Sequence, residues 1–233
     1  LPHYVKCNCF NGLHGRALPV AAAAKIANHT LTVLATTGDG DCYGEGGNHL
    51  IHNIRRNTDI TVIVHDNQIY GLTKGQASPT TDPGYVTKVQ TEGVVLDPLH
   101  PLEMAIALGA GFVARGYSLD IEHLSWLISE GIKHKGFSLI DVLQPCVSFN
   151  KKNTYEWYTQ RVYKVNDDSS YNPEDKMAAY EKAHEWGDRI PIGIICRAEK
   201  ETYEEKKGLS QGIPLVEEQI EDVDITSILS EFV

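Results

Sequence analysis

Short apolar runs alternate with helical patterns along most of this chain, and no other feature constrains the fold as much. The clearest runs are LTVLATT at 31–37, ITVIVHD at 60–66, FSLIDVLQ at 137–144 and IPIGIICR at 190–197. Runs of this length separated by helical segments are typical of βαβ units, whose strands pair in parallel. The sequence therefore predicts an α/β fold in which helices flank a parallel sheet.

The remaining elements follow from residue spacing and composition. Helices are predicted at 17–28, 45–56, 101–109, 120–134, 154–162 and 174–186, with a short strand at 112–115 and a short helix near 224–231. A polar connection at 73–100, rich in Gly, Pro and Thr, is too long to be a passive link. We expect an α/β domain over 1–150, with 151–233 as a helical and irregular C-terminal extension packed on the same domain.

Composition excludes several classes of protein. The 233 residues carry a formal net charge of −10 and contain no basic block, which argues against a nucleic-acid partner. No apolar run is long enough to span a membrane, and no signal-peptide pattern is visible. An odd number of cysteines, 5, does not make a disulfide framework. We expect a cytoplasmic chain with reduced thiols, and the start at Leu1 without methionine indicates processing or a fragment.

The most informative stretch is GDGDCYGEGGNHL, from Gly38 to Leu50. Glycines let the backbone approach a bulky anion, and the following helix N-terminus supplies unpaired N–H groups. Asp39 suits such a site if Mg²⁺ lies between its carboxylate and the phosphates. Asn67 ends the next strand, and the carboxyl ends of parallel strands meet at one edge of the sheet. The alternative is that Asp39 only caps a helix or tightens a turn.

Several longer blocks share one resemblance. GLHGRALP at 12–19, GDGD at 38–41 with GGNHLIHNIRRN at 46–57, DNQIYGLTKGQASPTT at 66–81 and LQPCVSFN at 143–150 resemble the beta subunit of 2-oxoacid:ferredoxin oxidoreductases. The resemblance is to the pyruvate and 2-ketoisovalerate type and runs nearly the whole length. It implies a thiamine pyrophosphate-binding α/β domain of the pyrophosphate type.

The resemblance also implies the cofactor-binding residues. Asp39, the side chain of Asn67 and the backbone carbonyl of Ile69 would bind Mg²⁺. The residues expected at the thiamine pyrophosphate are His14, Gly15, Gly38, Gly40, Asp41 and Thr73, with backbone N–H groups of Gly40 and Asp41 on the pyrophosphate. His14 would approach the pyrophosphate or the thiazolium face, although it could instead stabilise a turn.

Two residues of the YGLTKGQ block are expected beside the reaction. Leu72 and Lys74 would lie near the thiazolium and the substrate, as catalytic residues. Lys74 is suited to attract the carboxylate of a 2-oxoacid as a point charge, and the alternative is a solvated loop lysine. His49 and His52, on the helix after the cofactor turn, are expected to serve packing or the surface.

The family reaction needs groups that this chain does not carry. The glutamate that activates thiamine belongs to the pyrimidine domain of an alpha subunit, and gamma and delta subunits are possible further partners. A [4Fe–4S] cluster is held by four cysteines of the beta subunit, of which only Cys146 is matched here, so we interpret the chain as truncated at its amino terminus. Cys7 and Cys9 do not match ligand positions, and Cys42 and Cys196 are expected to be small buried residues.

The resemblance implies an enzyme subunit that binds thiamine pyrophosphate and Mg²⁺, oxidatively decarboxylates a 2-oxoacid with coenzyme A and reduces ferredoxin. Two alternatives remain at this point. One is a binding subunit without a cluster and without catalysis, and the other is a non-oxidative thiamine-dependent decarboxylase. Cys146 in the LQPC block favours the first interpretation, since neither alternative needs that cysteine.

Overall fold

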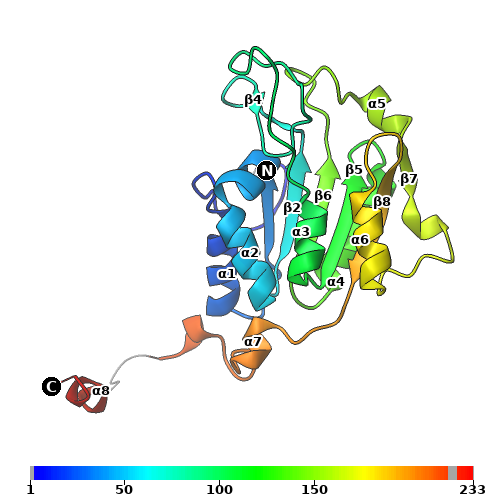
Figure 1. Cartoon of the computed structure of the whole chain (residues 1–233). Coiled ribbons are helices and arrows are strands. Elements are labelled where there is room, and N and C mark those ends of the chain that lie inside the picture. The colour runs from blue at the N-terminus through cyan, green and yellow to red at the C-terminus, as the bar shows by residue number, and fades with distance from the viewer. Residues whose placement is uncertain (1–2, 220–224, 233) are drawn as a thin grey trace.

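A six-stranded sheet with helices on both faces forms the body of the molecule (Figure 1). The computed structural model describes residues 3–219 and 225–232. In spatial order the strands are β1 (Leu34–Gly38), β2 (Thr61–Asp66), β6 (Ser138–Leu143), β5 (Phe112–Tyr117), β8 (Ile190–Arg197) and β7 (Val162–Lys164). The predicted α/β class with flanking helices is confirmed.

The pairing is parallel across the four strands on the side of the sheet that carries the cofactor motif. β1, β2, β6 and β5 all run in the same direction, whereas β8 pairs antiparallel with β5 and β7 pairs parallel with β8. The expectation of a wholly parallel sheet is therefore wrong for these last two strands. An apolar run such as IPIGIICR is buried equally well in either direction, so its sequence carries no signal for orientation.

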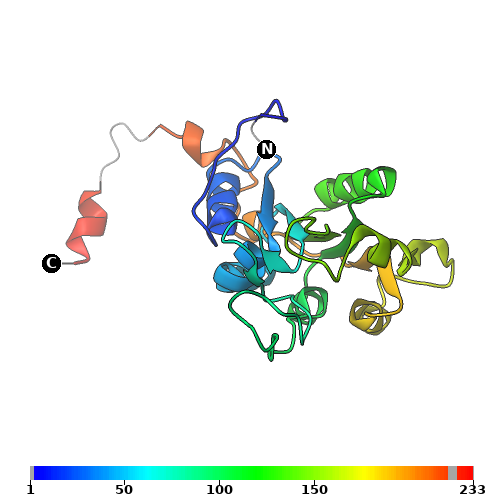
Figure 2. The ribbon, with the colours of Figure 1, turned by 90° about the horizontal axis from the view of Figure 1, so that it is seen from above.

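Two layers of helices bury the two faces of the sheet, as the view from above shows (Figure 2). The larger apolar cluster joins the sheet to α1 (Ala17–Ala27), α2 (Gly47–Arg56), α3 (Pro101–Leu108) and α6 (Lys176–His184). On the other face α4 (Ile121–Lys133) packs through Leu127 against Ile63, Ile140 and Val142. Alternate residues of β2 and β6 thus face opposite layers, as the two-residue period of a strand requires.

The structure adjusts several predicted boundaries. β1 begins at Leu34 rather than at 31, and the predicted helix at 154–162 divides into α5 (Tyr155–Thr159) and β7. The polar connection contains β4 (Gln76–Ala77), which pairs with β3 (Ile69–Tyr70) in a small hairpin. The tail holds a short α7 (Tyr203–Lys206) that the sequence did not predict. α8 (Thr226–Ser230) lies within the predicted helix at 224–231, of which residue 224 is outside the described residues.

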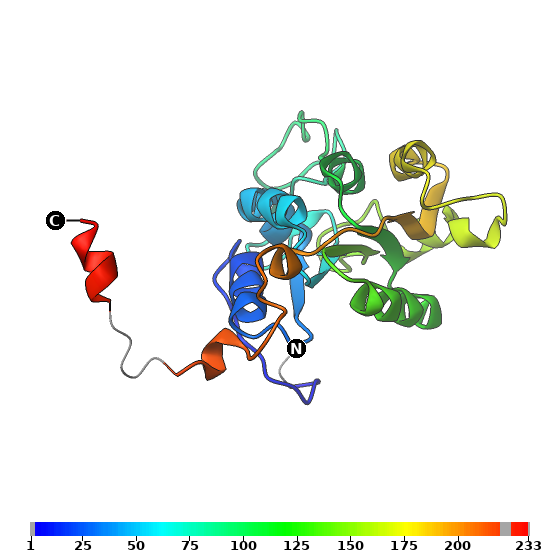
Figure 3. The same ribbon diagram turned by 90° about the horizontal axis from the view of Figure 1, so that it is seen from below.

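The chain after β8 crosses the end of the sheet opposite the cofactor motif, passing α2 and reaching α1 (Figure 3). Asn57 fixes this crossing from a left-handed conformation at the end of α2, with φ of 57°. Its Nδ2 donates to the carbonyls of Lys200 and Glu201 at 3.1 and 3.2 Å, and its Oδ1 accepts the Phe137 N–H at 3.0 Å. One side chain thereby joins α2, β6 and the tail.

Residues on both sides of position 150 build the same sheet, because β7 and β8 complete it. Over residues 3–219 and 225–232, no helix is long and apolar enough to cross a membrane.

Candidate functional site

The carboxyl ends of β1 and β2 bring Asp39 and Asn67 together. Asp39 follows the last residue of β1 and is 1% exposed. Its carboxylate accepts hydrogen bonds from the hydroxyls of Ser78 and Thr80, the latter at 2.9 Å, and from the backbone N–H of Asn67. The two predicted magnesium ligands are therefore direct neighbours.

The turn after β2 is held by its own side chains. Asn67 Oδ1 accepts the N–H of Ile69 at 3.1 Å, and Asp66 Oδ1 accepts the N–H of Gln68 at the same distance. The Asn67 carbonyl accepts a bond from Asn150 Nδ2 at 3.3 Å. Asn150 belongs to the SFN block after β6, so this bond joins two of the segments that carry the resemblance.

Three carboxyl groups are buried near the turn. Burial raises the pKa values of Asp39 and Asp66, although hydroxyl and backbone hydrogen bonds oppose the rise. Burial also raises the pKa of Asp141 to about 6, against the lowering effect of Arg115. Thr80 Oγ1 lies 2.9 Å from Asp39 Oδ2 and 2.8 Å from Asp66 Oδ1. This hydroxyl therefore lies between two of the three buried carboxyl groups.

This set of groups fits a magnesium ion. Carboxylate, amide and carbonyl oxygens are the ligands that Mg²⁺ takes from proteins, usually beside substrate phosphates. No lysine or arginine of the described residues forms an ion pair with Asp39 or Asp66. A divalent cation would therefore supply the charge that balances the buried carboxylates.

The turn itself is one turn of π-helix, η1 (Gly40–Glu45), directly followed by α2. The Asp41 side chain points toward earlier segments of the chain. Its carboxylate accepts hydrogen bonds from the backbone N–H of Gly15 and from the hydroxyl of Thr37. His14 Nε2 lies 3.5 Å from Asp41 Oδ1 and 3.6 Å from Glu45 Oε2. The GLHGRA block therefore contacts the cofactor turn. These contacts are compatible with His14 as a cofactor-binding residue and with His14 as a residue that stabilises the turn.

The glycines of the turn have different reasons to be glycine. A Cβ built on Gly38 meets no described atom within 4 Å, so this position is open to a ligand. A Cβ on Gly40 would overlap Cε1 of Tyr70, whose ring covers that residue. Gly15 has a φ of +73°, and its Cβ would lie 2.7 Å from the Cβ of Glu45. Gly40 is therefore required by Tyr70, in addition to any ligand.

Leu72, Thr73 and Lys74 form the exposed tip of the β3–β4 hairpin. Leu72 is 96% exposed, and Lys74 has a φ of 85°, which is rare for a residue with a side chain. Gly75 packs so closely on Phe149 that a Cβ would lie 2.8 Å from its ring. The hairpin is thereby joined to the loop after β6, which carries Cys146.

Comparison with known protein families agrees with this geometry. Residues 1–142 match the family described as thiamine pyrophosphate enzyme, C-terminal TPP binding domain. Residues 146–210 match the family described as the C terminal of the pyruvate ferredoxin oxidoreductase beta subunit.

Individual relatives give the same result. The 2-oxoacid:ferredoxin oxidoreductase subunit beta of Saccharolobus solfataricus is 46% identical over 218 residues, covering 88% of this chain and 72% of the relative. Subunit beta of 2-oxoacid:ferredoxin oxidoreductase 1 from Aeropyrum pernix is 45% identical, covering 88% and 68%. The chain belongs to the beta subunits of 2-oxoacid:ferredoxin oxidoreductases.

A solved structure supports the same assignment for this beta subunit. The chain matches 2-oxoglutarate:ferredoxin oxidoreductase from Magnetococcus marinus, solved with 2-oxoglutarate, coenzyme A and succinyl-CoA bound. The TM-score is 0.83 at 30% sequence identity, and the match covers 94% of this chain and 73% of the other.

The cysteines of the beta subunit differ in access. Cys146 is half-buried in the loop after β6, whereas Cys7 and Cys9 are exposed with their sulfurs 3.6 Å apart. Cys42 and Cys196 are buried, as predicted, and burial raises the pKa of both thiols. Within residues 3–219 and 225–232, no three His, Cys, Asp or Glu side chains are grouped to hold a metal. The described residues therefore do not make an iron–sulfur site by themselves.

The two histidines expected to serve packing or the surface both lie on α2. His52 is exposed, and His49 is half-buried with Nε2 at 3.2 Å from Arg16 Nη1. Neither contacts Asp39 or Asn67 through a hydrogen bond.

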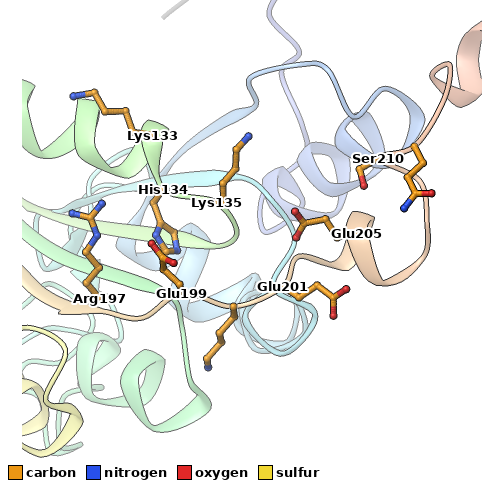
Figure 4. A pocket seen from close by; sticks show the side chains of 10 residues that line it. Lys133, His134, Lys135, Arg197, Glu199, Glu201, Glu205 and Ser210 are labelled. Carbon is orange, nitrogen blue, oxygen red and sulfur yellow. The ribbon is translucent and has the colours of Figure 1, made fainter.

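A cavity of about 790 Å³ lies at the opposite end of the sheet (Figure 4). Its walls are the end of α4, with Lys133, His134 and Lys135, and the chain from Arg197 onward. Lys133 and Arg197 both pair with Glu130, at 2.9 and 3.5 Å, and Lys200 donates to the Gly109 carbonyl. Both basic side chains and carboxylates line this cavity. None of the site residues predicted from the sequence is among the residues that line it.

Several residues that hold the candidate site were not predicted from the sequence. Ser78 and Thr80 bind Asp39, and Tyr70 covers Gly40. All three belong to the DNQIYGLTKGQASPTT block, whose run of small hydroxyl residues was a usable signal.

Proposed function

We propose that this beta subunit binds thiamine pyrophosphate through Mg²⁺ and, with partner subunits, oxidatively decarboxylates a 2-oxoacid with coenzyme A and reduces ferredoxin. The contact between Asp39 and Asn67 carries the proposal. The buried Asp39 carboxylate accepts the backbone N–H of Asn67, so the two residues meet at the ends of adjacent parallel strands, where α/β proteins bind their ligands. The relatives described above act in the same class of reaction by name.

The proposed cofactor site uses the turn and the strand ends. Asp39, Asn67 Oδ1 and the Ile69 carbonyl would hold Mg²⁺. The pyrophosphate would lie against the backbone of the turn. Residues proposed to contact the cofactor are His14, Gly15, Gly38, Gly40, Asp41 and Thr73. When bound, thiamine pyrophosphate supplies the stabilisation of a carbanion, and the protein supplies orientation and electrostatics.

Several side chains of the beta subunit prepare this site. Ser78 and Thr80 fix the Asp39 carboxylate, so its orientation does not depend on the metal alone. Tyr70 holds the first residue of the turn, with its hydroxyl 3.3 Å from the Gly40 carbonyl. Leu72 and Lys74 extend from the hairpin tip, and we propose that Lys74 attracts the carboxylate of the 2-oxoacid.

The proposed partners follow from what the site lacks. The chain provides the pyrophosphate side of a thiamine site, so an alpha subunit would add the pyrimidine side and its activating glutamate. Gamma and delta subunits, ferredoxin and a cytoplasmic location complete the proposal. Cys146 is proposed as one thiolate ligand of a [4Fe–4S] cluster. Because a cluster normally needs four thiolates, we derive no electron-transfer step from the described residues.

An assay of the assembled enzyme tests the function. When purified together with its partner subunits, the beta chain should reduce a viologen dye if a 2-oxoacid, coenzyme A, thiamine pyrophosphate and Mg²⁺ are supplied. The beta chain alone, under the same conditions, should show little turnover. Dye reduction that needs no 2-oxoacid, or full turnover by the chain alone, would contradict the proposal.

Lys74→Met should weaken the use of the 2-oxoacid. Removing a point charge beside an anionic substrate is expected to raise the KM for the 2-oxoacid about tenfold, which corresponds to about 1.4 kcal/mol. Steady-state kinetics of the assembled enzyme measure this. Lys88→Met is the matched control, since it removes a lysine from the same long connection. Equal KM values for both variants and the native enzyme would remove Lys74 from the site.

A further inference from the structure

We infer that Asp141, held by Arg115, positions the pyrophosphate-binding turn through the hydroxyl of Tyr43. This inference rests on the proposed function. It assigns roles to three buried polar residues that neither bind the proposed metal nor belong to the turn's backbone contacts.

Tyr43 anchors the turn from within. It lies in η1 two positions after Asp41, yet its side chain is buried and only 5% exposed. Its hydroxyl donates to Asp141 Oδ1 at 2.7 Å. Asp141 is in β6 at the centre of the sheet and is 1% exposed. A buried hydrogen bond therefore joins the cofactor turn to a central strand of the sheet.

Arg115 holds the carboxylate from the neighbouring strand. It is directly opposite Asp141 in the pairing of β5 with β6, and its Nε lies 3.7 Å from Asp141 Oδ2. The guanidinium also lies over the ring of Trp186, 5.4 Å from its centroid. The arginine is thus fixed between an aspartate and an aromatic ring.

A small cavity of about 30 Å³ adjoins this group. Asp66, Thr80, Arg115, Asp141 and Trp186 are among the residues that line it. Arg115 Nε and Nη1 are buried there and form no hydrogen bond with described residues. The volume suits one ordered water. Thr80 also donates to Asp39 and contacts Asp66. The buried polar groups around this cavity therefore extend from Asp141 to Asp39, the proposed metal ligand.

Stability alone does not account for this arrangement. A buried ion pair gains little over well-packed apolar residues of the same volume, because desolvation offsets the attraction. A hydrogen bond to a buried charge is, in contrast, directional and well defined. The group therefore suits a positioning role: it sets where the turn after β1 lies relative to the strand ends.

The experiment is a pair of substitutions in the assembled enzyme. Tyr43→Phe removes only the hydroxyl, and the Kd for thiamine pyrophosphate with saturating Mg²⁺, measured by calorimetry on cofactor-stripped enzyme, should rise about tenfold. The KM for the cofactor should rise with it, while kcat at saturating cofactor stays near the native value. Tyr163→Phe is the matched control, because its hydroxyl also donates to a carboxylate, Glu185 Oε2, but far from the turn.

Variants of the acceptor identify the contact. Asp141→Asn keeps an acceptor oxygen for Tyr43 and should retain most of the affinity, whereas Asp141→Leu should lose about as much as Tyr43→Phe. In the Asp141→Leu enzyme, adding Tyr43→Phe should change the Kd little further, since the two side chains act through one bond. If Asp141→Leu folds poorly, the Kd values of Tyr43→Phe and Asp141→Asn still test the contact.

The outcomes separate the two proposals. If the native enzyme binds no thiamine pyrophosphate with Mg²⁺, the proposed function fails and this inference fails with it. If the native enzyme binds the cofactor and Tyr43→Phe leaves its Kd unchanged, only the positioning role is overturned. A lower unfolding temperature with an unchanged Kd would likewise assign the bond to stability alone.

Discussion

Replacing Asp39 with alanine should abolish Mg²⁺-dependent binding of thiamine pyrophosphate. We expect the affinity to fall by more than about a hundredfold, because loss of a group that merely orients a metal ligand already costs 10- to 100-fold. Calorimetric titration of the assembled enzyme with the cofactor, with and without Mg²⁺, measures this. Unchanged binding would remove Asp39 from the metal site.

Substitution of Asp39 should not lower the stability of the metal-free chain, although it should abolish cofactor binding. Burial raises the pKa of Asp39, so its ionised form is disfavoured in the folded chain and costs folding free energy at neutral pH. Asp39→Asn removes the charge, so the metal-free chain should unfold at a temperature no lower than the native chain. Glu204→Gln is the control, since Glu204 is 2% exposed at the other end of the sheet and should leave cofactor binding intact.

Much of this candidate site was predictable because it depends on the order of strands and turns along a short stretch of the sequence. A glycine–aspartate turn after one buried strand and an asparagine after the next must meet at one edge if the strands pair in parallel. β1 and β2 pair in that way, with Gly38 opposite His65. The prediction needed only the strand pattern and the residue order, and both are local properties of the sequence.

The groups that hold the site depend on long-range packing. Tyr43 and Asp141 are 98 positions apart, and Ser78 and Asp39 are 39 apart. Neither pair carries a periodicity, so no local pattern joins them. The direction of β8 was missed for a similar reason: it depends on the path through α5, β7 and α6, not on the apolar run itself.

The two glycines of the GDG turn, Gly38 and Gly40, are glycine for different reasons. A glycine in a phosphate-binding turn is expected to give a ligand access to the backbone. In this structure the Tyr70 ring occupies the space of a Cβ at Gly40, whereas the space beside Gly38 is open. Only the position of Tyr70, supplied by the β3–β4 hairpin, distinguishes the two glycines.

The second large effect concerns Cys146. Cys146→Ser in the assembled enzyme should remove the proposed [4Fe–4S] cluster and ferredoxin reduction, while the affinity for thiamine pyrophosphate stays within about twofold of native. Serine keeps the size of the side chain but does not provide the thiolate that such clusters use. Iron and sulfide content, visible absorption and cofactor calorimetry measure the three quantities on one preparation.

The position of Cys146 makes this separation possible. Its loop follows β6 and contacts the hairpin through Phe149 and Gly75, yet Cys146 itself does not bond to Asp39, Asn67 or the turn. Loss of its sulfur should therefore leave the metal–pyrophosphate side unchanged. Cys196→Ser is the matched control, because that thiol is buried in β8 and should leave the iron content unchanged. If iron survives Cys146→Ser, the cluster is held by other residues, and the LQPC block serves only the packing of the loop.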